Sequence, residues 1–256
     1  MTVPGIVATL EGPVARVRID RPGARNALTL AMYDGLIGAL AALRGNDAVR
    51  LLVLEGDDKA FAAGTEISEF TAFKSGSDGL AYETRVEQVI DTLETLPFPT
   101  LAAVKGVATG GGLMLAVSCD LQLLSASARI GAPIARTVGN CLSSRNLARL
   151  QTLVGPALLR RMLFAAELLP ASEIVGSAFP TWIVGADAFE ATLAQKIDAI
   201  ACAAPLTQRA TKASLIRIAR NDFNDTDIIE RTYGSADFAE GVAAFLERRK
   251  PAWQNR

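Results

Sequence analysis

The chain has 256 residues, of which 50% are hydrophobic and 21% charged, so it can bury a large core in one domain or in a domain with a small appendage. Its 26 basic and 27 acidic residues nearly cancel, and no Lys/Arg cluster lies on any expected helix, which argues against nucleic acid as a partner. The chain contains no histidine, and this excludes Ser-His or Cys-His nucleophile pairs, HExxH zinc sites and any imidazole acid or base.

The first elements expected along the chain are a hairpin, a helix and a strand. Residues 5–20 alternate apolar and charged side chains around Glu11-Gly12, which predicts a hairpin that leads into a sheet. From Thr29, an expected N-cap, apolar residues recur at helical spacing until Gly45-Asn46 stops the pattern. A buried strand is expected next, at residues 50–56.

The middle of the chain repeats this order. Residues 83–96 return to helical spacing, and two prolines at 97 and 99 end that helix. One buried strand is expected at residues 100–107, followed by three glycines, a helix and a further strand at residues 121–126. Strands that alternate with helices in this way are the βαβ pattern of an α/β domain with parallel strands.

After about residue 143 the expected structure is nearly all helical. Amphipathic segments with short connections occupy residues 147–155, 156–166, 188–204, 206–219 and 238–249. The sequence has no internal repeat, low-complexity segment or long linker. We therefore expect these helices to form a C-terminal layer or subdomain packed on the sheet domain.

The cellular compartment can be inferred from the cysteines and from the apolar segments. The three cysteines are far apart and form no CxxC pair, which is typical of a reducing compartment and predicts free thiols and no metal site. Residues 1–20 lack the unbroken apolar core of a signal peptide. The most apolar run, residues 101–124, carries Lys105 and Asp120, so a membrane span there would be costly. These features predict a cytoplasmic protein without a membrane partner.

The most informative stretch is ATGGGLMLAVSCD, residues 108–120, where three glycines lead from a strand into a helix. Such a turn gathers free backbone N–H groups and the positive end of the helix dipole, which together favour an anionic oxygen. Leu113-Met114 stand where a P-loop needs Lys and Ser/Thr, and Leu115 stands at the third small residue of a dinucleotide fingerprint. A nicotinamide-dependent reductase is therefore disfavoured, which leaves either oxyanion stabilisation or a tight turn that serves packing alone.

A second turn of small residues occurs in GDDKAFAAGTEISEF, residues 56–70, where Gly64 precedes Thr65 after a strand. Two such strand ends could each supply one N–H group to a single oxygen. Together with RPGARNAL at residues 21–28 and the ending EGVAAFLERRKPAW, these motifs resemble the crotonase (enoyl-CoA hydratase/isomerase) superfamily. The resemblance covers essentially the whole chain.

The resemblance implies an α/β, crotonase-like fold of repeated ββα and βαβ units with a C-terminal helical subdomain. The acyl-CoA-binding core would span residues 1–190, and a helical region at residues 191–256 would mediate a homotrimer or a dimer of trimers. The substrate would be an acyl-CoA thioester. Coenzyme A would then enter as part of the substrate, with no separate cofactor and no metal.

In similar proteins, two backbone N–H groups hold the thioester oxygen, and the matching residues here are Thr65 and Gly111. Such donors stabilise the enolate that forms when a proton is removed next to a thioester, and losing one typically costs about 3 kcal/mol. Arg25 would meet the CoA phosphates or be a solvated loop charge, and Glu66 is expected to be structural rather than a base. Further substrate contacts are expected from Ala63, Ile67, Ser68 and Gly110.

Hydratases of the family add water with two glutamates, and the matching positions here hold Met114 and Ile134. Neither a thioether nor an alkyl group can move a proton, so both residues are expected to fill an apolar acyl pocket. Their presence counts against ordinary hydration. It leaves open decarboxylation, another acyl-CoA reaction carried by the oxyanion hole alone, or acyl-CoA binding without catalysis.

Three nearby residues could take part in substrate binding, and each has a plainer alternative. Arg136 could hold a carboxylate on the acyl chain but is expected to point to solvent. Asn140 could orient a substrate or water but is expected to cap the helix that begins near Ser143. Cys141 could act as a base or nucleophile if its pKa were lowered, but buried, inert packing is the favoured interpretation.

Overall fold

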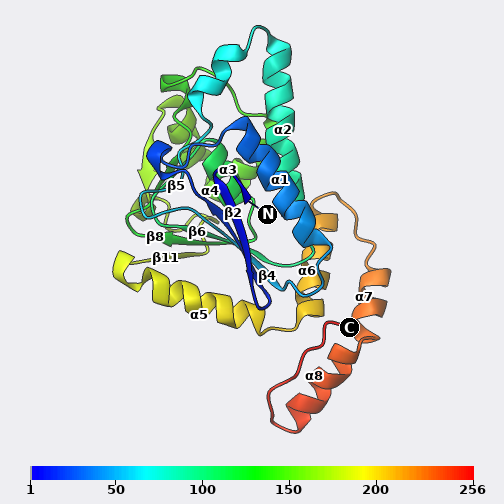
Figure 1. Cartoon of the computed structure of the whole chain (residues 1–256). Coiled ribbons are helices and arrows are strands. Elements are labelled where there is room, and N and C mark those ends of the chain that lie inside the picture. Colours follow the sequence, from blue (N-terminus) through cyan, green and yellow to red (C-terminus); the bar gives the residue numbers. More distant parts are fainter. Residues whose placement is uncertain (1) are drawn as a thin grey trace.

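The computed structural model describes residues 2–256 and folds them into helices around two β-sheets (Figure 1). The larger sheet has seven strands in the order β1-β2-β3-β4-β6-β8-β11. The strands from β3 to β11 run parallel, and β1 to β3 are antiparallel neighbours. The expected α/β class is confirmed. The strands are β1 Thr2–Val3, β2 Ile6–Glu11, β3 Val14–Ile19, β4 Leu51–Glu55, β6 Thr100–Val104, β8 Leu121–Ser125 and β11 Trp182–Val184.

The smaller sheet has four strands in the order β10-β9-β7-β5. They are β5 Ala60–Ala62, β7 Val107–Thr109, β9 Arg129–Gly131 and β10 Leu168–Pro170. The single strand expected at residues 100–107 is therefore wrong, because β6 and β7 belong to different sheets. The chain changes sheet at Gly106, where any Cβ would collide with the backbone of Lys59. This crossing carries the chain directly from the large sheet to the glycine-rich turn.

Eight α-helices lie within the described residues, and the first of them confirms the expected start and stop signals. They are α1 Leu30–Arg44, α2 Gly76–Glu94, α3 Gly111–Val117, α4 Ser144–Phe164, α5 Phe189–Ala201, α6 Pro205–Ile218, α7 Thr226–Tyr233 and α8 Ala236–Leu246. Thr29 caps α1 by accepting a hydrogen bond from the N–H of Met32, and the helix ends at Gly45. Helix α2 begins earlier than the expected residue 83 because Ser75 and Asp78 form a capping box.

The expectation of nearly all helix after residue 143 is wrong at two short strands. Strand β10 pairs with β9, and β11 extends the large sheet by pairing in parallel with β8. Both strands have three residues, which is too short for a period-two pattern to stand out in the sequence. The two helices expected on either side of residue 155 are present and share the label α4; they meet at Gly155, whose φ of 80° and ψ of 161° are not helical, and Pro156 opens the second.

The hydrophobic core occupies both faces of the large sheet. On one face, side chains of β4 and β6 such as Val53 and Leu101 pack against Phe189 and Leu193 of α5. On the other face, helices α1 to α4 bury a larger cluster against the sheets. The expected boundary at residue 190 falls in the first turn of α5, and the division into two functional parts stays a prediction.

The last helices are attached by polar contacts. Lys212 of α6 is buried, and its Nζ lies 2.6 Å from the carboxylate of Asp120 and 3.1 Å from the carbonyl of Phe98. Arg50 donates to the carbonyl of Trp253 at 3.0 Å, which ties the segment after α8 to the sheet domain. Figure 1 shows α8 reaching away from the body of the molecule. In the part of the chain that is described, no helix combines the length and apolarity needed to cross a membrane.

Candidate active site

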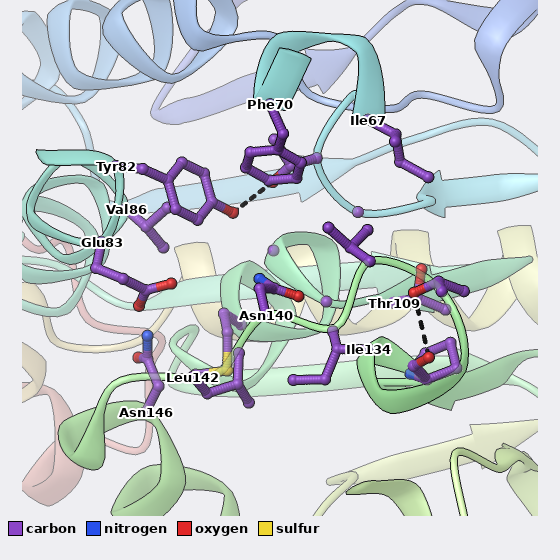
Figure 2. A pocket seen from close by; sticks show the side chains of 18 of the residues that line it. Ile67, Phe70, Tyr82, Glu83, Val86, Thr109, Ile134, Asn140, Leu142 and Asn146 are labelled. Carbon is purple, nitrogen blue, oxygen red and sulfur yellow. Dashed lines mark hydrogen bonds between the residues drawn. The ribbon is translucent and has the colours of Figure 1, made fainter. Parts of the chain in front are cut away.

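A pocket with a volume of about 130 Å³ lies among the two glycine-containing turns, helix α2 and the segment that leads into α4 (Figure 2). Its walls are mostly apolar, with a few polar side chains. The lining residues are Ala63, Gly64, Thr65, Ile67, Phe70, Tyr82, Glu83, Val86, Thr109, Gly110, Gly111, Met114, Pro133, Ile134, Thr137, Val138, Asn140, Leu142 and Asn146.

Pairing of β5 with β7 brings the two turns together. The strands are parallel, with Ala62 opposite Ala108, so the carboxyl ends of both strands lie at the same side of the small sheet. The turn after β5 then passes through Gly64 and Thr65, and the turn after β7 enters α3 at Gly111. Two motifs that lie far apart in the sequence therefore meet at one pocket, as the sequence predicted.

Each of the two turns has a backbone N–H group without an acceptor at a residue that lines this pocket. The neighbours of Thr65 are bonded to Leu28, since Leu28 N donates to Gly64 O and Glu66 N donates to Leu28 O. The N–H of Thr65 itself, like that of Gly111 at the start of α3, has no acceptor within residues 2–256. Two free donors in one apolar pocket can together hold an oxygen that gains negative charge.

A chain of hydroxyl groups fixes these turns. Tyr33 Oη lies 2.8 Å from Thr65 Oγ1, which lies 2.6 Å from Tyr82 Oη. Burial raises the pKa of both tyrosines, so their hydroxyls stay protonated at neutral pH. The Tyr33 hydroxyl also fills the space where a Cβ of residue 111 would lie. Glycine is therefore required at position 111 by packing as well as by ligand access.

Eight of the sequence-predicted site residues line the pocket. They are Ala63, Thr65, Ile67, Gly110, Gly111, Met114, Ile134 and Asn140. Met114 lies one helical turn after Gly111 and is 1% exposed, so the wall next to the N–H donor is apolar, as expected.

The predicted residues outside the pocket have other partners. Glu66 pairs with Arg21 at 2.6 Å, and this pairing lowers the pKa of the carboxyl, which also accepts a hydrogen bond from the N–H of Ser68. These contacts agree with the structural role expected of Glu66, which stays a prediction. Arg25 is exposed on its loop, and its carbonyl accepts a hydrogen bond from Ala63 N. The expected contacts of Arg25, Glu66 and Ser68 with the CoA stay predictions.

Three expectations for the segment before α4 have different outcomes. Arg136 is exposed and donates to the carbonyl of Ala165 at 2.7 Å, away from the pocket, so the solvent-facing alternative is confirmed. Asn140 does not cap α4: Ser143 is the N-cap, and Asn140 lines the pocket. Buried packing of Cys141 is wrong, because this cysteine is exposed and lies outside the lining of the pocket.

Five polar residues of the pocket were missed by the sequence analysis: Tyr82, Glu83, Thr109, Thr137 and Asn146. Glu83 is half-buried on α2, and Figure 2 shows its carboxyl directed into the pocket. Burial raises the pKa of Glu83 and the nearby Glu87 adds to the rise, whereas a hydrogen bond from Ser143 N opposes it. Residue 83 lies on the same helical stripe as the buried Val86 and Ile90, and this position was the available signal.

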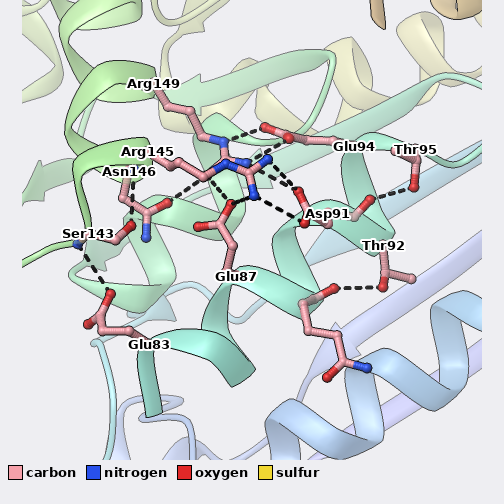
Figure 3. A network of polar contacts seen from close by, with 11 residues as sticks. Glu83, Glu87, Asp91, Thr92, Glu94, Thr95, Ser143, Arg145, Asn146 and Arg149 are labelled. Carbon is pink, nitrogen blue, oxygen red and sulfur yellow. Dashed lines mark hydrogen bonds and ion pairs between the residues drawn. The ribbon is translucent and has the colours of Figure 1, made fainter. Parts of the chain in front are cut away.

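A network of ion pairs behind the pocket joins α4 to α2 (Figure 3). Arg149 donates to both carboxylate oxygens of Glu94, at 2.8 and 2.9 Å, and lies 2.7 Å from Glu87. The same guanidinium donates to Asn146 Oδ1 at 2.9 Å. The outer Arg145 pairs with Asp91 at 3.1 Å. These contacts hold Asn146 in a fixed position at the pocket wall.

For a metal ion, the relevant pattern is a cluster of acidic, cysteine or histidine side chains. Among the residues that the structure describes, no group of three or more such side chains is placed to hold one. The pocket offers backbone N–H donors, one carboxyl group, two amide side chains and the hydroxyl groups of three threonines and one tyrosine. These groups can bind and polarise an oxygen-containing ligand.

Comparisons with known proteins agree along the whole chain. The sequence profile described as enoyl-CoA hydratase/isomerase matches residues 9–256. A short-chain-enoyl-CoA hydratase from Clostridium acetobutylicum is 28% identical, over 98% of this chain and 97% of its own length. A crotonyl-CoA hydratase from Syntrophomonas wolfei is also 28% identical, over 98% of both chains. A crystal structure of an enoyl-CoA hydratase/carnithine racemase from Magnetospirillum magneticum is 31% identical and superposes with a TM-score of 0.94, covering 100% of this chain and 97% of the other.

Proposed function

The chain belongs to the enoyl-CoA hydratase/isomerase family, and from that premise we propose that it binds an acyl-CoA thioester whose oxygen accepts hydrogen bonds from Thr65 and Gly111. The observation that carries the proposal is the pair of unpartnered backbone N–H groups, which come from two turns and line one pocket. Names of relatives such as crotonyl-CoA hydratase support the thioester as the substrate class.

The chemistry that this arrangement favours is formation of a thioester enolate. When a proton leaves the carbon next to the thioester, negative charge develops on the oxygen, and fixed donors in an apolar pocket stabilise it. Coenzyme A then enters as part of the substrate, and the proposal needs neither another cofactor nor a metal.

Ordinary hydration is not expected, because Met114 and Ile134 supply no carboxylate to the pocket. Decarboxylation of a carboxylated acyl-CoA has little support, since Arg136 faces away and, in the described chain, no Lys or Arg lines the pocket. The apolar residues at 114 and 134 instead favour acyl-CoA binding without turnover as the second candidate function.

The pocket volume favours a short acyl group. An apolar cavity of about 150 Å³ in another protein holds a benzene molecule with its six carbon atoms. The pocket here, at about 130 Å³, therefore has room for an acyl group of about six non-hydrogen atoms.

We further propose that the protein assembles as a homotrimer or a dimer of trimers and acts in the cytoplasm. Exposed apolar side chains gather on α7 and α8, and covering them with a second copy would remove that surface from water. They include Ile229, Tyr233, Phe238, Val242, Phe245 and Leu246.

The deciding experiment pairs calorimetric binding of butyryl-CoA with a crotonyl-CoA hydration assay at high protein concentration. We expect binding of butyryl-CoA without measurable hydration. Rapid hydration would show that another group replaces the two glutamates. If butyryl-CoA did not bind, the proposed function would be overturned.

A further inference from the structure

Asn146 presents an unpartnered donor to the pocket. Its Oδ1 accepts from Arg149 Nη1 at 2.9 Å, and because a guanidinium can only donate, the oxygen of the amide must face Arg149. The amide nitrogen therefore faces the other way, toward Glu83, as Figure 2 shows. This side chain is 1% exposed, and Nδ2 has no hydrogen-bond partner in the described chain. A buried donor of this kind fits a ligand acceptor.

Glu83 presents an acceptor next to it. The N–H of Ser143 donates to Oε2 of Glu83 at 3.2 Å, and Oε1 has no donor among residues 2–256. In Figure 2 the carboxyl group of Glu83 enters the same side of the pocket as the side chains of Asn140 and Asn146. This side of the pocket therefore offers both a free acceptor and a free donor to one ligand atom.

The rest of the lining near Glu83 and Asn146 is mostly apolar, so these two side chains are where a polar atom of a ligand would bind. Near the oxygen-binding N–H of Gly111 the wall is formed by Met114, and Val86 and Leu142 continue the apolar surface. An acyl chain would therefore meet apolar side chains next to its thioester and polar groups of α2 and α4 elsewhere. Such a lining selects for a polar atom at one point of an otherwise apolar chain.

We propose that Glu83 and Asn146 bind a hydroxyl group on the acyl chain, beyond its third carbon, so that the substrates are hydroxyacyl thioesters. A hydroxyl donates to Glu83 Oε1 and accepts from Asn146 Nδ2 at the same time, which no alkyl group can do. A carboxylate at this place would meet the negative charge of Glu83 and, among the described lining residues, no cation. The inference rests on the proposed acyl-CoA binding and adds the substrate class.

The test uses two thioesters of equal size, 4-hydroxybutyryl-CoA and pentanoyl-CoA, which differ by a hydroxyl in place of a methyl. Calorimetry on the full chain gives a Kd for each. We expect about tenfold tighter binding of 4-hydroxybutyryl-CoA, since a site built to pair a hydroxyl rejects an analogue that lacks it.

Variants assign the preference to the two residues. In Asn146→Leu, which keeps the volume but removes the donor, the ratio of the two Kd values should fall to about one, while pentanoyl-CoA binding is retained. Glu83→Gln places an amide donor beside the hydroxyl and should also lower the ratio, and it serves if Asn146→Leu does not fold. The control Glu94→Gln perturbs the same Arg149 network outside the pocket lining and should keep the ratio.

The outcomes separate this inference from the proposed function. Binding of both esters with equal affinity, or a preference that survives in Asn146→Leu and Glu83→Gln, would overturn the hydroxyl site and leave acyl-CoA binding intact. Binding of neither ester would overturn the proposed function and the hydroxyl site together.

Discussion

The pocket and the α7–α8 arm, residues 226–246, both leave groups without a partner, but these groups are polar in the pocket and apolar on the arm. The pocket leaves polar groups without partners: the N–H groups of Thr65 and Gly111 and the amide nitrogen of Asn146. The arm leaves apolar side chains in water, with Phe245 83% and Leu246 74% exposed. Unpaired donors in a rigid pocket fit a small ligand with oxygen atoms, whereas an exposed apolar patch fits another protein surface. The pocket and the arm therefore fit two different kinds of partner, a small ligand and a protein surface.

The largest effect is expected from a substitution that disrupts the donor groups of the pocket. Gly111→Ala places a methyl group on the Tyr33 hydroxyl and displaces the N–H donor, so turnover of the best acyl-CoA substrate should fall at least about 100-fold. Gly23→Ala, whose Cβ has no atom within 4 Å, is the control. Steady-state kinetics or, for a binding protein, calorimetry with butyryl-CoA measures the loss. Equal values for the two variants would contradict the role of the turn.

The second prediction concerns the exposed apolar side chains of the α7–α8 arm. Phe245→Glu adds a charge to the exposed apolar face of α8, and we expect the oligomer to dissociate because that face could no longer be buried. Light scattering coupled to size-exclusion chromatography should show a mass near that of one chain. Leu10→Glu, on the exposed edge of β2, should keep the wild-type mass. A wild-type protein that is already monomeric would refute the proposed assembly.

A third, smaller effect sharpens the comparison by showing what holds the pocket wall in place. Arg149, with 15% of its side chain exposed, pairs with Glu87 and Glu94, and Arg149→Ala leaves Glu94 without its partner and Glu87 with the exposed Arg145 alone. The free energy of unfolding should fall by about 2 kcal/mol. Arg145→Ala, at an arginine that is 62% exposed, should cost about 0.5 kcal/mol or less. Urea denaturation measures both, and equal losses would contradict this ranking.

The smallest effect is a pH dependence inside the pocket. Burial raises the pKa of Glu83 above its ordinary value of 4.5, so the carboxyl group binds its proton more tightly in the folded state than in the unfolded state. The contribution of Glu83 to stability is therefore greatest at low pH and declines as the pH rises through that raised pKa. Glu83→Gln removes this titration, so the variant should gain stability relative to wild type between pH 4 and pH 8. Parallel stability curves for the two proteins would contradict the shift.

The same contrast explains how much the sequence could predict. The Thr29 cap and the two glycine-containing turns depend on local residue types, and the structure has them where they were expected. The paired turns meet because parallel β5 and β7 end at the same side of the small sheet, a second sheet that the sequence analysis did not expect.

What the sequence could not supply depends on contacts between distant elements. The change of sheet at Gly106 is set by the backbone of Lys59, which no periodicity reveals. Glu83 appeared to be the start of a helical stripe, and only the packing of α2 against the segment before α4 turns it into the pocket. Asn146 is a pocket residue only because Arg149 orients its amide.

The hydroxyl of Tyr33 has a further consequence for how this pocket can change during evolution. It occupies the place of a side chain at residue 111, so these two positions, far apart in the sequence, cannot vary independently. A chain that lost the hydroxyl would gain room for alanine at 111, but it would also lose one of the two hydroxyl contacts of Thr65, the other being that with Tyr82. Residues 33 and 111 are therefore coupled through space, and the double variant Tyr33→Phe with Gly111→Ala should be tolerated better than Gly111→Ala alone.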